Sequence, residues 1–453
     1  MRALPSLLPA LVLVLAACGG DGGNSAPPAI IPGGGIHDPG IDGPVNVFVI
    51  DADSDAPVAG ATVRIGEVEG TTDATGLFVF TDLTGPQTIL AKAAGHAAAM
   101  WVGADGANVT IPLDETPTVV APVAQARLSG SIAGWDALPA PAANHVRIAA
   151  VAFAQDPQLG STANEIPPPP PTNNIPAAAC VRLPTAGSPP CAWRLNARTG
   201  TIALGLVVID VDGRGTATQA DDLQTVTGYS VKQPLTVVGG VDQAGLVMDL
   251  PGNLSTTSAT IAVGTPPAGL SQVNAIAGLD LGATGVLRLA NIDATRPTAI
   301  IPSLSLASGA SYELIGLAQE PITDGTAAQS IVIRRDLTTA TALAAGEWLP
   351  PPTGLASDRS TASFTRGRAE GPYIIELDTS SGGGSSNRAL SIAILDASSQ
   401  VTLPTGFAPL PSGSLTMRVT TLDIGTPVDL RDFDVDTLTE GAIRFASDTI
   451  KLN

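Results

Sequence analysis

The sequence is poor in the residue types on which catalytic and nucleic-acid-binding sites depend. Its 453 residues include three lysines, three histidines and three cysteines, its aromatic content is 3%, and its net charge is −19. Binding to nucleic acid requires clustered lysine and arginine side chains that neutralise phosphates, and the sequence has no such cluster. The composition therefore excludes a nucleic-acid partner and predicts an acidic surface, which favours solubility outside the cell.

The common catalytic motifs are also missing. The sequence has no glycine-rich loop with a lysine, no Gly-x-Ser-x-Gly, no His-Glu-x-x-His and no Cys-x-x-Cys. Its histidines, His37, His96 and His145, lie far apart, whereas serine and metal-dependent hydrolases place histidine in a defined constellation. We therefore expect no catalytic residues and no enzymatic activity. A hydrolase built on two carboxylates leaves no linear signature and stays open as an alternative.

The N-terminal residues predict export. Arg2 precedes an apolar run at residues 7–15, and two alanines then lead into Cys18, which is the order of a cleavable signal peptide. The sequence Leu-Ala-Ala-Cys that ends at Cys18 resembles the lipobox of bacterial lipoproteins. This resemblance implies that residues 1–17 are a signal peptide and that Cys18 is the lipidation site.

The residues after Cys18 predict how the protein is held at the membrane. Residues 18–43 are rich in glycine and proline, and we expect a flexible tether there. An aspartate directly after the lipidated cysteine would resemble the inner-membrane retention signal of many lipoproteins. Gly19 stands there instead, so we expect the outer membrane of a bacterial cell envelope.

Strand signals dominate the rest of the chain. Short β-branched and leucine-rich runs alternate with turns formed from 49 glycines and 39 prolines, a pattern typical of many short strands. No amphipathic run of helical period follows the leader. A prior of about 150 residues per domain gives about three domains. We predict an all-β chain of tandem β-sandwich domains, transthyretin-like or immunoglobulin-like.

The first predicted domain covers residues 44–116. Residues 57–65, 71–83 and 93–96 read Pro-Val-Ala-Gly-Ala-Thr-Val-Arg-Ile, Thr-Thr-Asp-Ala-Thr-Gly-Leu-Phe-Val-Phe-Thr-Asp-Leu and Ala-Ala-Gly-His. This order of strands and turns resembles the carboxypeptidase regulatory-like domain, a seven-stranded transthyretin-like sandwich. The resemblance implies that fold over about a sixth of the chain, and it implies no catalytic residue.

Two further regions follow the first domain. Residues 124–251 repeat the same signals more loosely and predict a second β-sandwich. Its insertion at residues 156–190 contains five consecutive prolines at 167–171, which predict extended polyproline II rather than a central strand. Residues 252–453 suit either one large sandwich or two small ones, and the sequence leaves both open.

Two cysteines remain once Cys18 is acylated. Cys180 and Cys191 form an even pair in an oxidising compartment, with a loop-like sequence between them. We predict a disulfide between them, which would stabilise the fold by about 2–3 kcal/mol in the chain-entropy model.

Three acidic runs are candidates for calcium binding. Residues 51–55 begin like a calcium loop but lack its glycine and its closing glutamate. Residues 432–436 place three carboxylates on one strand face. Asp210 and Asp212 are the better weak calcium candidates, because residues 221–222 add two more aspartates. Each run is also explained by a solvated turn or strand face, and we expect no other cofactor.

Aromatic residues give little support for carbohydrate binding, which usually requires exposed rings that stack on sugars. We expect the four tryptophans to fill sandwich cores, with Trp135 and Trp348, both beside turns, as candidates for surface positions. The sequence thus predicts a lipid-anchored, non-catalytic binding or structural module of the cell envelope. Its partner would be an envelope protein, or a glycan if the protein is a surface glycan-binding lipoprotein.

Overall fold

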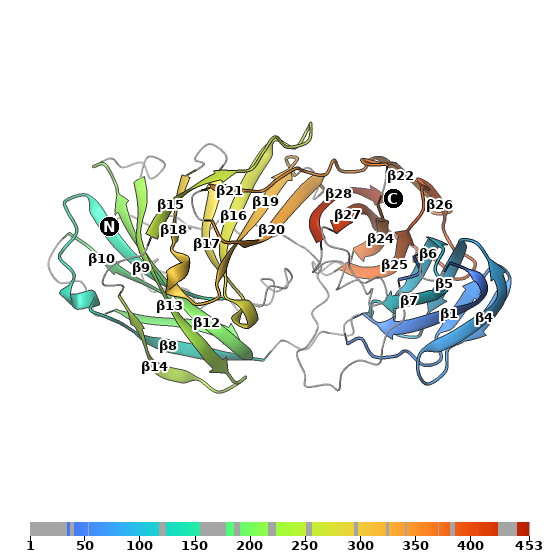
Figure 1. Cartoon of the computed structure of the whole chain (residues 1–453), viewed down its shortest axis with the longest axis horizontal. Helices are drawn as coiled ribbons and strands as arrows, with labels where there is room; N and C mark the ends of the chain where they lie inside the picture. Colours follow the sequence, from blue (N-terminus) through green and yellow to red (C-terminus); the bar gives the residue numbers. More distant parts are fainter. Residues whose placement is uncertain are drawn as a thin grey trace.

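The structure, a computed structural model, consists almost entirely of β-strands in a row of sandwiches (Figure 1). This confirms the predicted all-β class and the tandem β-sandwich arrangement. The residues that the structure describes are 34–36, 40–52, 54–116, 124–154, 178–184, 191–215, 223–250, 256–293, 298–322, 326–339, 342–369, 371–380, 386–424 and 442–452. Over these ranges the helical segments are the short 3₁₀ turns η1 (Trp135–Ala137), η4 (Gly282–Thr284) and η5 (Leu304–Leu306). No helix in these ranges is long and apolar enough to cross a bilayer.

The N-terminal strands form a seven-stranded sandwich, which we call repeat 1 (residues 42–113). Its strands are β1 (Asp42–Asp51), β2 (Thr62–Ile65), β3 (Val68–Thr71), β4 (Leu77–Thr84), β5 (Gln87–Lys92), β6 (Ala98–Ala104) and β7 (Asn108–Leu113). One layer has the order β4-β1-β7, with β1 and β7 parallel, and the other has the order β6-β5-β2-β3. Seven strands in two layers make repeat 1 a β-sandwich, as predicted for this part of the chain.

Period-two alternation explains why the strands of repeat 1 form a core. Val45, Val47 and Val49 of β1 are completely buried, and they pack with Trp101 of the opposite layer in one cluster. Gly76, at the turn before β4, has a φ of +74°, and a Cβ there would lie 2.5 Å from the Val49 carbonyl oxygen. The turn therefore requires glycine.

Two more sandwiches repeat this strand order. Repeat 2 (residues 125–249) contains β8 (Gln125–Ala133), β9 (His145–Phe153), β10 (Ala179–Arg182), β11 (Ala192–Arg198), β12 (Gly200–Asp212), β13 (Leu223–Val237) and β14 (Gln243–Asp249). Repeat 3 (residues 256–344) contains β15 (Thr256–Ala262), β16 (Gln272–Asp280), β17 (Val286–Asp293), β18 (Thr298–Pro302), β19 (Ser311–Gln319), β20 (Gln329–Leu337) and β21 (Ala342–Ala344). In all three repeats the fourth, first and seventh strands form one layer and the other four form the second. The first and seventh strands are parallel in each.

The last sandwich, repeat 4 (residues 353–452), has a modified order. Its strands are β22 (Thr353–Ser357), β23 (Thr361–Thr365), β24 (Tyr373–Ser380), β25 (Ser386–Ile394), β26 (Gln400–Thr402), β27 (Leu415–Ile424) and β28 (Ala442–Leu452). The layer β25-β24-β27-β28 matches its counterparts, but β22 pairs antiparallel with β23 on the side where a seventh strand would lie. Residues 256–344 and 353–452 thus form two small sandwiches with separate cores.

A disulfide connects the two layers of repeat 2. Cys180 in β10 is bonded to Cys191, which directly precedes β11, and their Cα atoms are 5.3 Å apart. Both residues are buried within the core of the repeat. The disulfide predicted from the sequence is therefore present, and it staples strands of opposite layers.

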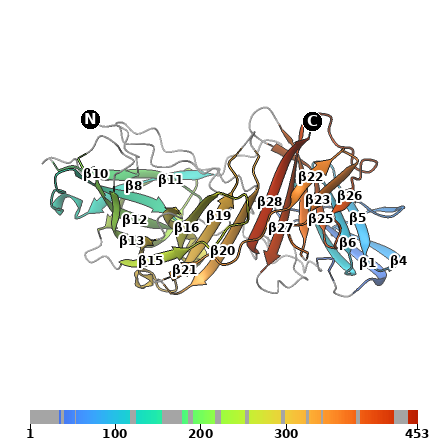
Figure 2. The same ribbon diagram turned by 90° about the horizontal axis from the view of Figure 1, so that it is seen from above.

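The four-stranded layers of repeats 3, 4 and 1 join edge to edge into one twelve-stranded sheet (Figure 2). Repeat 3 joins repeat 4 through the antiparallel pairing of β20 with β28 over four residue pairs. Repeat 4 joins repeat 1 through the parallel pairing of β25 with β6 over five residue pairs. The first repeat therefore lies beside the last one, although repeats 2 and 3 separate them in the chain.

Strands β5 and β6 serve two cores at once. Their inner face belongs to repeat 1, whereas Leu90, Ala98 and Met100 on the opposite face belong to the core of repeat 4. The Lys92 ammonium donates a hydrogen bond of 2.8 Å to the Phe407 carbonyl oxygen and lies 4.3 Å from the centre of the Phe407 ring. Repeats 1 and 4 are therefore packed together as well as hydrogen-bonded.

Repeat 2 packs against repeat 3 across a face rather than along an edge. The Tyr229 hydroxyl donates to the Ile300 carbonyl oxygen at 3.0 Å, and Ala203 belongs to the core of repeat 3. A Cβ on Gly205 would lie 2.3 Å from the Leu287 side chain, so glycine permits this close approach.

Part of the segment expected to be a flexible tether, residues 18–43, packs on repeat 1. The Gly35 N–H donates to the Asn108 carbonyl oxygen at 2.9 Å, Ile41 is 6% exposed in the core, and β1 begins before residue 44. The folded region begins earlier than predicted because the Gly35 backbone pairs with β7, the Ile41 N–H donates to the Asp105 carbonyl oxygen, and the start of β1 pairs with β4. Residues 1–33, and most of the insertion at 156–190, lie outside the described residues.

Candidate metal centre

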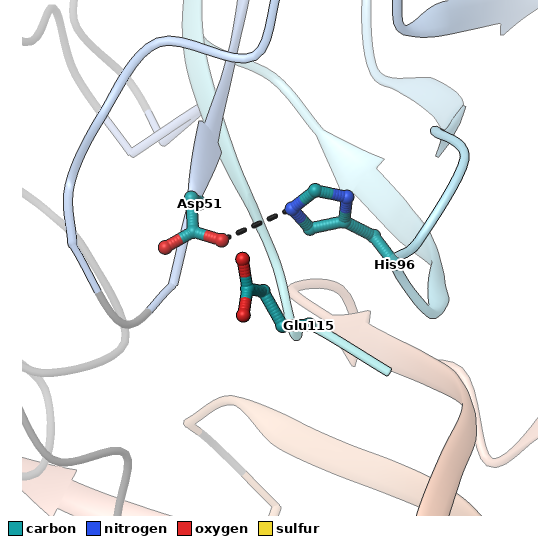
Figure 3. Close-up of side chains that lie close together, drawn as sticks. All are labelled: Asp51, His96 and Glu115. Atoms are coloured by element: carbon teal, nitrogen blue, oxygen red, sulfur yellow. Dashed lines mark hydrogen bonds and ion pairs between the residues drawn. The ribbon is translucent and has the colours of Figure 1, made fainter. Parts of the chain in front are cut away.

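Three chain segments of repeat 1 meet at one edge of its three-stranded layer. Because β1 and β7 are parallel, their carboxyl ends lie together, with Asp51 opposite Leu113. The turn between β5 and β6 reaches the same edge, where His96 and Glu115 form an antiparallel bridge. The topology thus gathers Asp51, His96 and Glu115 from distant positions in the sequence (Figure 3).

The three side chains converge on one another. Nε2 of His96 lies 3.0 Å from Oδ2 of Asp51, and Figure 3 shows the Glu115 carboxylate beside this pair. One ligand atom from each of the three residues lies within 4.8 Å of the other two. Asp51 is buried, His96 is partly buried and Glu115 is exposed. Within the described ranges, no other group of three His, Cys, Asp or Glu side chains is close enough to share a metal ion.

Neighbouring groups orient the buried pair. Ser54 donates two hydrogen bonds to Oδ1 of Asp51, one from its N–H at 2.8 Å and one from its hydroxyl at 2.6 Å, while Oδ2 faces His96. Nδ1 of His96 lies 3.2 Å from the Ala94 carbonyl oxygen. Because a carbonyl oxygen can only accept, Nδ1 carries the proton of this bond. Nε2 then either donates to Asp51 or, without its proton, is able to bind a cation.

The same contacts determine the charge of Asp51. Burial raises the pKa of its carboxyl group, but hydrogen bonds from Ser54 and His96 outweigh burial, and the pKa lies below its ordinary value of 3.8. Asp51 is therefore ionised at neutral pH, as a metal-binding carboxylate must be.

The position of Asp51 is apolar in two other repeats. In the parallel ladder between the first and seventh strands of repeat 1, the last pair with two buried side chains is Asp51 and Leu113. The last such pair is Ile132 and Met248 in repeat 2. In repeat 3 it is Ile261 and Leu343. The fold thus places a buried side chain here in each case, and repeat 1 alone of the three uses a carboxylate.

An ion cluster lies next to this edge. Arg388 of β25 contacts Asp114 at 3.0 Å and Asp378 at 2.7 Å, and it also pairs with Glu376. Burial alone would lower the pKa of Arg388, but the three carboxylates raise it above its ordinary value. Asp114 directly precedes Glu115 in the segment that follows β7. The cluster therefore connects this segment of repeat 1 to β25 of repeat 4.

The predicted calcium candidates, Asp210 and Asp212 of β12, face basic side chains. Nη2 of Arg147 lies 3.1 Å from Asp210. The ring nitrogens of His145 lie 3.7 Å from Asp210 and 3.8 Å from Asp212. Both basic residues are the register partners of these aspartates on β9. Residues 221–222, expected to complete the site, lie outside the described residues.

Other candidate residues have separate positions. Cys18, His37 and the acidic run at 432–436 lie outside the described residues, as does Asp53. In the run at 51–55, Asp51 is the residue that joins the cluster with His96.

All tryptophans and tyrosines are buried, with 9% exposure at most. Trp135 and Trp348, the two candidates for surface positions, are 1% and 9% exposed. Trp348 donates from its ring nitrogen to the Val263 carbonyl oxygen at 2.6 Å, which satisfies its polar atom inside repeat 3. The prediction that the tryptophans fill cores is therefore confirmed.

Sequence reasoning missed Glu115 and the pairing of Asp51 with His96. The available signal was an acidic residue just after the first strand and another just after the last strand of one domain. Parallel pairing of those two strands places both residues at one edge, but this pairing is visible only in the structure.

Comparisons with known proteins leave the family open. No protein-family model matches the chain, and no curated protein matches it. The chain is similar to the solved structure of the Bacillus anthracis TIE protein, with 8% identity, a TM-score of 0.14, and coverage of 67% of this chain and 49% of that chain. It is also similar to a tetra-tandem repeat in the extending region of a large adhesion protein, with 11% identity and a TM-score of 0.14. This match covers 91% of this chain and 99% of that chain. The match to the first structure spans about half of that chain, and neither likeness assigns a function.

Proposed function

We propose that this chain is a lipid-anchored protein of the bacterial cell envelope that acts as a non-catalytic structural or binding module. The signal-peptide pattern and the lipobox-like sequence ending at Cys18 support the anchor. The observation that carries the structural role is the twelve-stranded sheet, which includes strands of repeats 1, 3 and 4.

The sheet makes a stiff body. Ladder hydrogen bonds join repeats 3, 4 and 1, and the Arg388 cluster and the shared strands β5 and β6 add contacts between repeats 4 and 1. Loops on such a frame keep fixed relative positions, which suits recognition of a large partner. The module would therefore present a defined surface at the end of its N-terminal anchor.

An envelope protein is the favoured partner class. Glycan recognition commonly uses exposed tryptophan and tyrosine rings, and every tryptophan and tyrosine of this chain is buried. Protein contact has no such requirement, since strand edges and polar loops are sufficient.

Membrane fractionation tests the anchor directly. We expect wild-type protein in the membrane fraction, and Cys18→Ser protein as an uncut precursor that is released from membranes. The double variant Cys180→Ala/Cys191→Ala is the matched control, because it removes the other cysteines and should stay in the membrane fraction. Equal membrane partitioning of the Cys18→Ser variant and wild type would contradict the anchor.

Turnover assays test the non-catalytic role. The purified protein should show no reproducible turnover of peptide or glycan substrates. Turnover that is lost on changing one carboxylate, such as Glu115→Gln, would show that the protein is a hydrolase.

A further inference from the structure

We propose that Asp51, His96 and Glu115 form a binding site for a divalent transition-metal ion of the Zn²⁺ class. Nε2 of His96, Oδ2 of Asp51 and the Glu115 carboxylate would be its three protein ligands, with solvent completing the coordination. This inference is independent of the anchor and of the partner proposed above.

The buried position of the Asp51 carboxylate is the first observation that supports a metal site. A buried carboxylate is costly unless it is paired, and repeats 2 and 3 complete the same fold with Ile132 and Ile261 at this position. Folding of the sandwich therefore does not require Asp51. Its presence together with His96 calls for a role that isoleucine does not provide, and cation binding is such a role.

The geometry needs small adjustments to hold an ion. Tetrahedral Zn²⁺ with ligands at about 2.0–2.1 Å separates its ligand atoms by about 3.4 Å. Nε2 of His96 and Oδ2 of Asp51 are 3.0 Å apart, so this pair must open by a few tenths of an ångström. The ligand atom of Glu115 lies within 4.8 Å of those of Asp51 and His96 and must move closer to them to share an ion. The Glu115 side chain is exposed and therefore has the freedom to move.

The hydrogen bonds that orient the ligand side chains are those typical of a metal site. Metal-binding histidines commonly donate their second ring N–H to a backbone carbonyl, and ligating carboxylates are themselves hydrogen-bonded. His96 has this contact with Ala94, and Asp51 has it with Ser54. Binding would replace the Nε2 proton with the ion, while Nδ1 keeps its proton.

The ligand set selects the class of ion. Calcium takes six to eight oxygen ligands, whereas an imidazole nitrogen with two carboxylates suits Zn²⁺ and similar ions. The other described histidine provides a contrast within the same molecule. His145 also lies near two aspartates, but Arg147 contacts Asp210 there, and its positive charge opposes a second cation.

Calorimetric titration with Zn²⁺ tests the site. Untagged full-length protein in detergent, stripped with a chelator that is then removed, should bind a single Zn²⁺ saturably. His96→Gln should weaken binding by at least about tenfold, since even outer-shell partners of a metal site are worth that much. Ser54→Ala should weaken it by about tenfold for the same reason. His145→Gln is the matched control and should bind as wild type does.

A second ligand variant guards against misfolding of the first. Glu115 is exposed, so Glu115→Gln should retain the wild-type circular dichroism spectrum and still bind Zn²⁺ less tightly. Calcium in excess should not displace bound Zn²⁺. The proposal is overturned by absence of saturable binding to wild type, by wild-type affinity in both the His96→Gln and Glu115→Gln variants, or by displacement with calcium.

Discussion

Repeats 1 and 3 have the same strand order but close the ladder between their first and seventh strands in different ways. Repeat 3 ends its buried part with Ile261 opposite Leu343, whereas repeat 1 has Asp51 opposite Leu113. The four-stranded layers of the two repeats have the same strand order. The comparison teaches that this fold provides a buried position at a fixed edge, and that repeat 1 uses it for a polar cluster with His96.

The two repeats also differ in how they join repeat 4. The junction of repeat 3 is a short antiparallel ladder between β20 and β28, with Ile331 and Phe445 in one buried apolar cluster. The junction of repeat 1 is a parallel ladder between β25 and β6, supplemented by the Arg388 cluster and by packing of Leu90 and Met100. Side chains reinforce both junctions, and the junction of repeat 1 adds the Arg388 ion cluster.

The largest expected effect comes from moving the carboxylate to the other repeat. Ile261→Asp removes a buried apolar side chain and leaves a charge with no histidine opposite it, so we expect a loss of about 4 kcal/mol in the free energy of unfolding. Urea unfolding followed by tryptophan fluorescence measures it, because Trp348 lies in the core of repeat 3. Ile261→Val, with an expected cost of about 1 kcal/mol, is the control. Equal stability of the two variants would break the comparison.

Removing the ionic contact between repeats 1 and 4 should have the next largest effect. Arg388→Met leaves Asp114, Glu376 and Asp378 without their shared partner, and we expect a loss of about 3 kcal/mol. Arg418→Met serves as the control, since Arg418 contacts Glu376 at 3.6 Å and carries less of the cluster. The urea midpoint of each variant gives the result, and a loss no larger than that of the control would show that the cluster is not what holds repeat 1.

The disulfide of repeat 2 gives a somewhat smaller effect. Replacing both Cys180 and Cys191 with alanine should lower the free energy of unfolding by about 2–3 kcal/mol, because a loop of the unfolded chain is no longer closed. The loss should appear in the unfolding of repeat 2, whose Trp135 and Trp193 share the core with both cysteines. Unchanged unfolding of this repeat would contradict the expectation.

The smallest expected effect is a change in the pH dependence of stability when Asp51 is replaced. Its pKa in the folded state lies below the ordinary value of 3.8, so its ionised form adds stability above that value, and this contribution disappears as the pH falls through the lowered pKa. Wild type should therefore lose more stability than Asp51→Asn on acidification from about pH 5 to pH 2. Urea midpoints measured across this range test it, and parallel curves for the two proteins would contradict it.

Much of the local structure was predictable from the sequence. The short β-branched and leucine-rich runs predicted an all-β chain, and the even pair Cys180 and Cys191 predicted the disulfide. These signals are local, or they depend on compartment chemistry. The sequence also predicted tryptophans in sandwich cores, but it left Trp135 and Trp348 as candidates for surface positions, and both are buried.

The long-range arrangement was not predictable. The pairing of β6 with β25, the contact of Asp114 with Arg388, and the meeting of Asp51 with Glu115 join residues far apart in the chain. Period-two alternation fixes which face of a strand is buried, but it does not identify the neighbouring strand. For the same reason, the antiparallel β22 at the position of a seventh strand in repeat 4 leaves no mark in the sequence pattern.

Hydrogen–deuterium exchange across the junction of repeats 1 and 4 tests the central claim, that the first and last repeats share one sheet. Each of the two junction strands, β6 and β25, has a ladder partner on both sides. We therefore predict slow exchange at successive amides of both strands, as slow as in β19 inside repeat 3. Fast exchange at every second amide of both strands, as in an edge strand with one open side, would show that the two repeats are not joined.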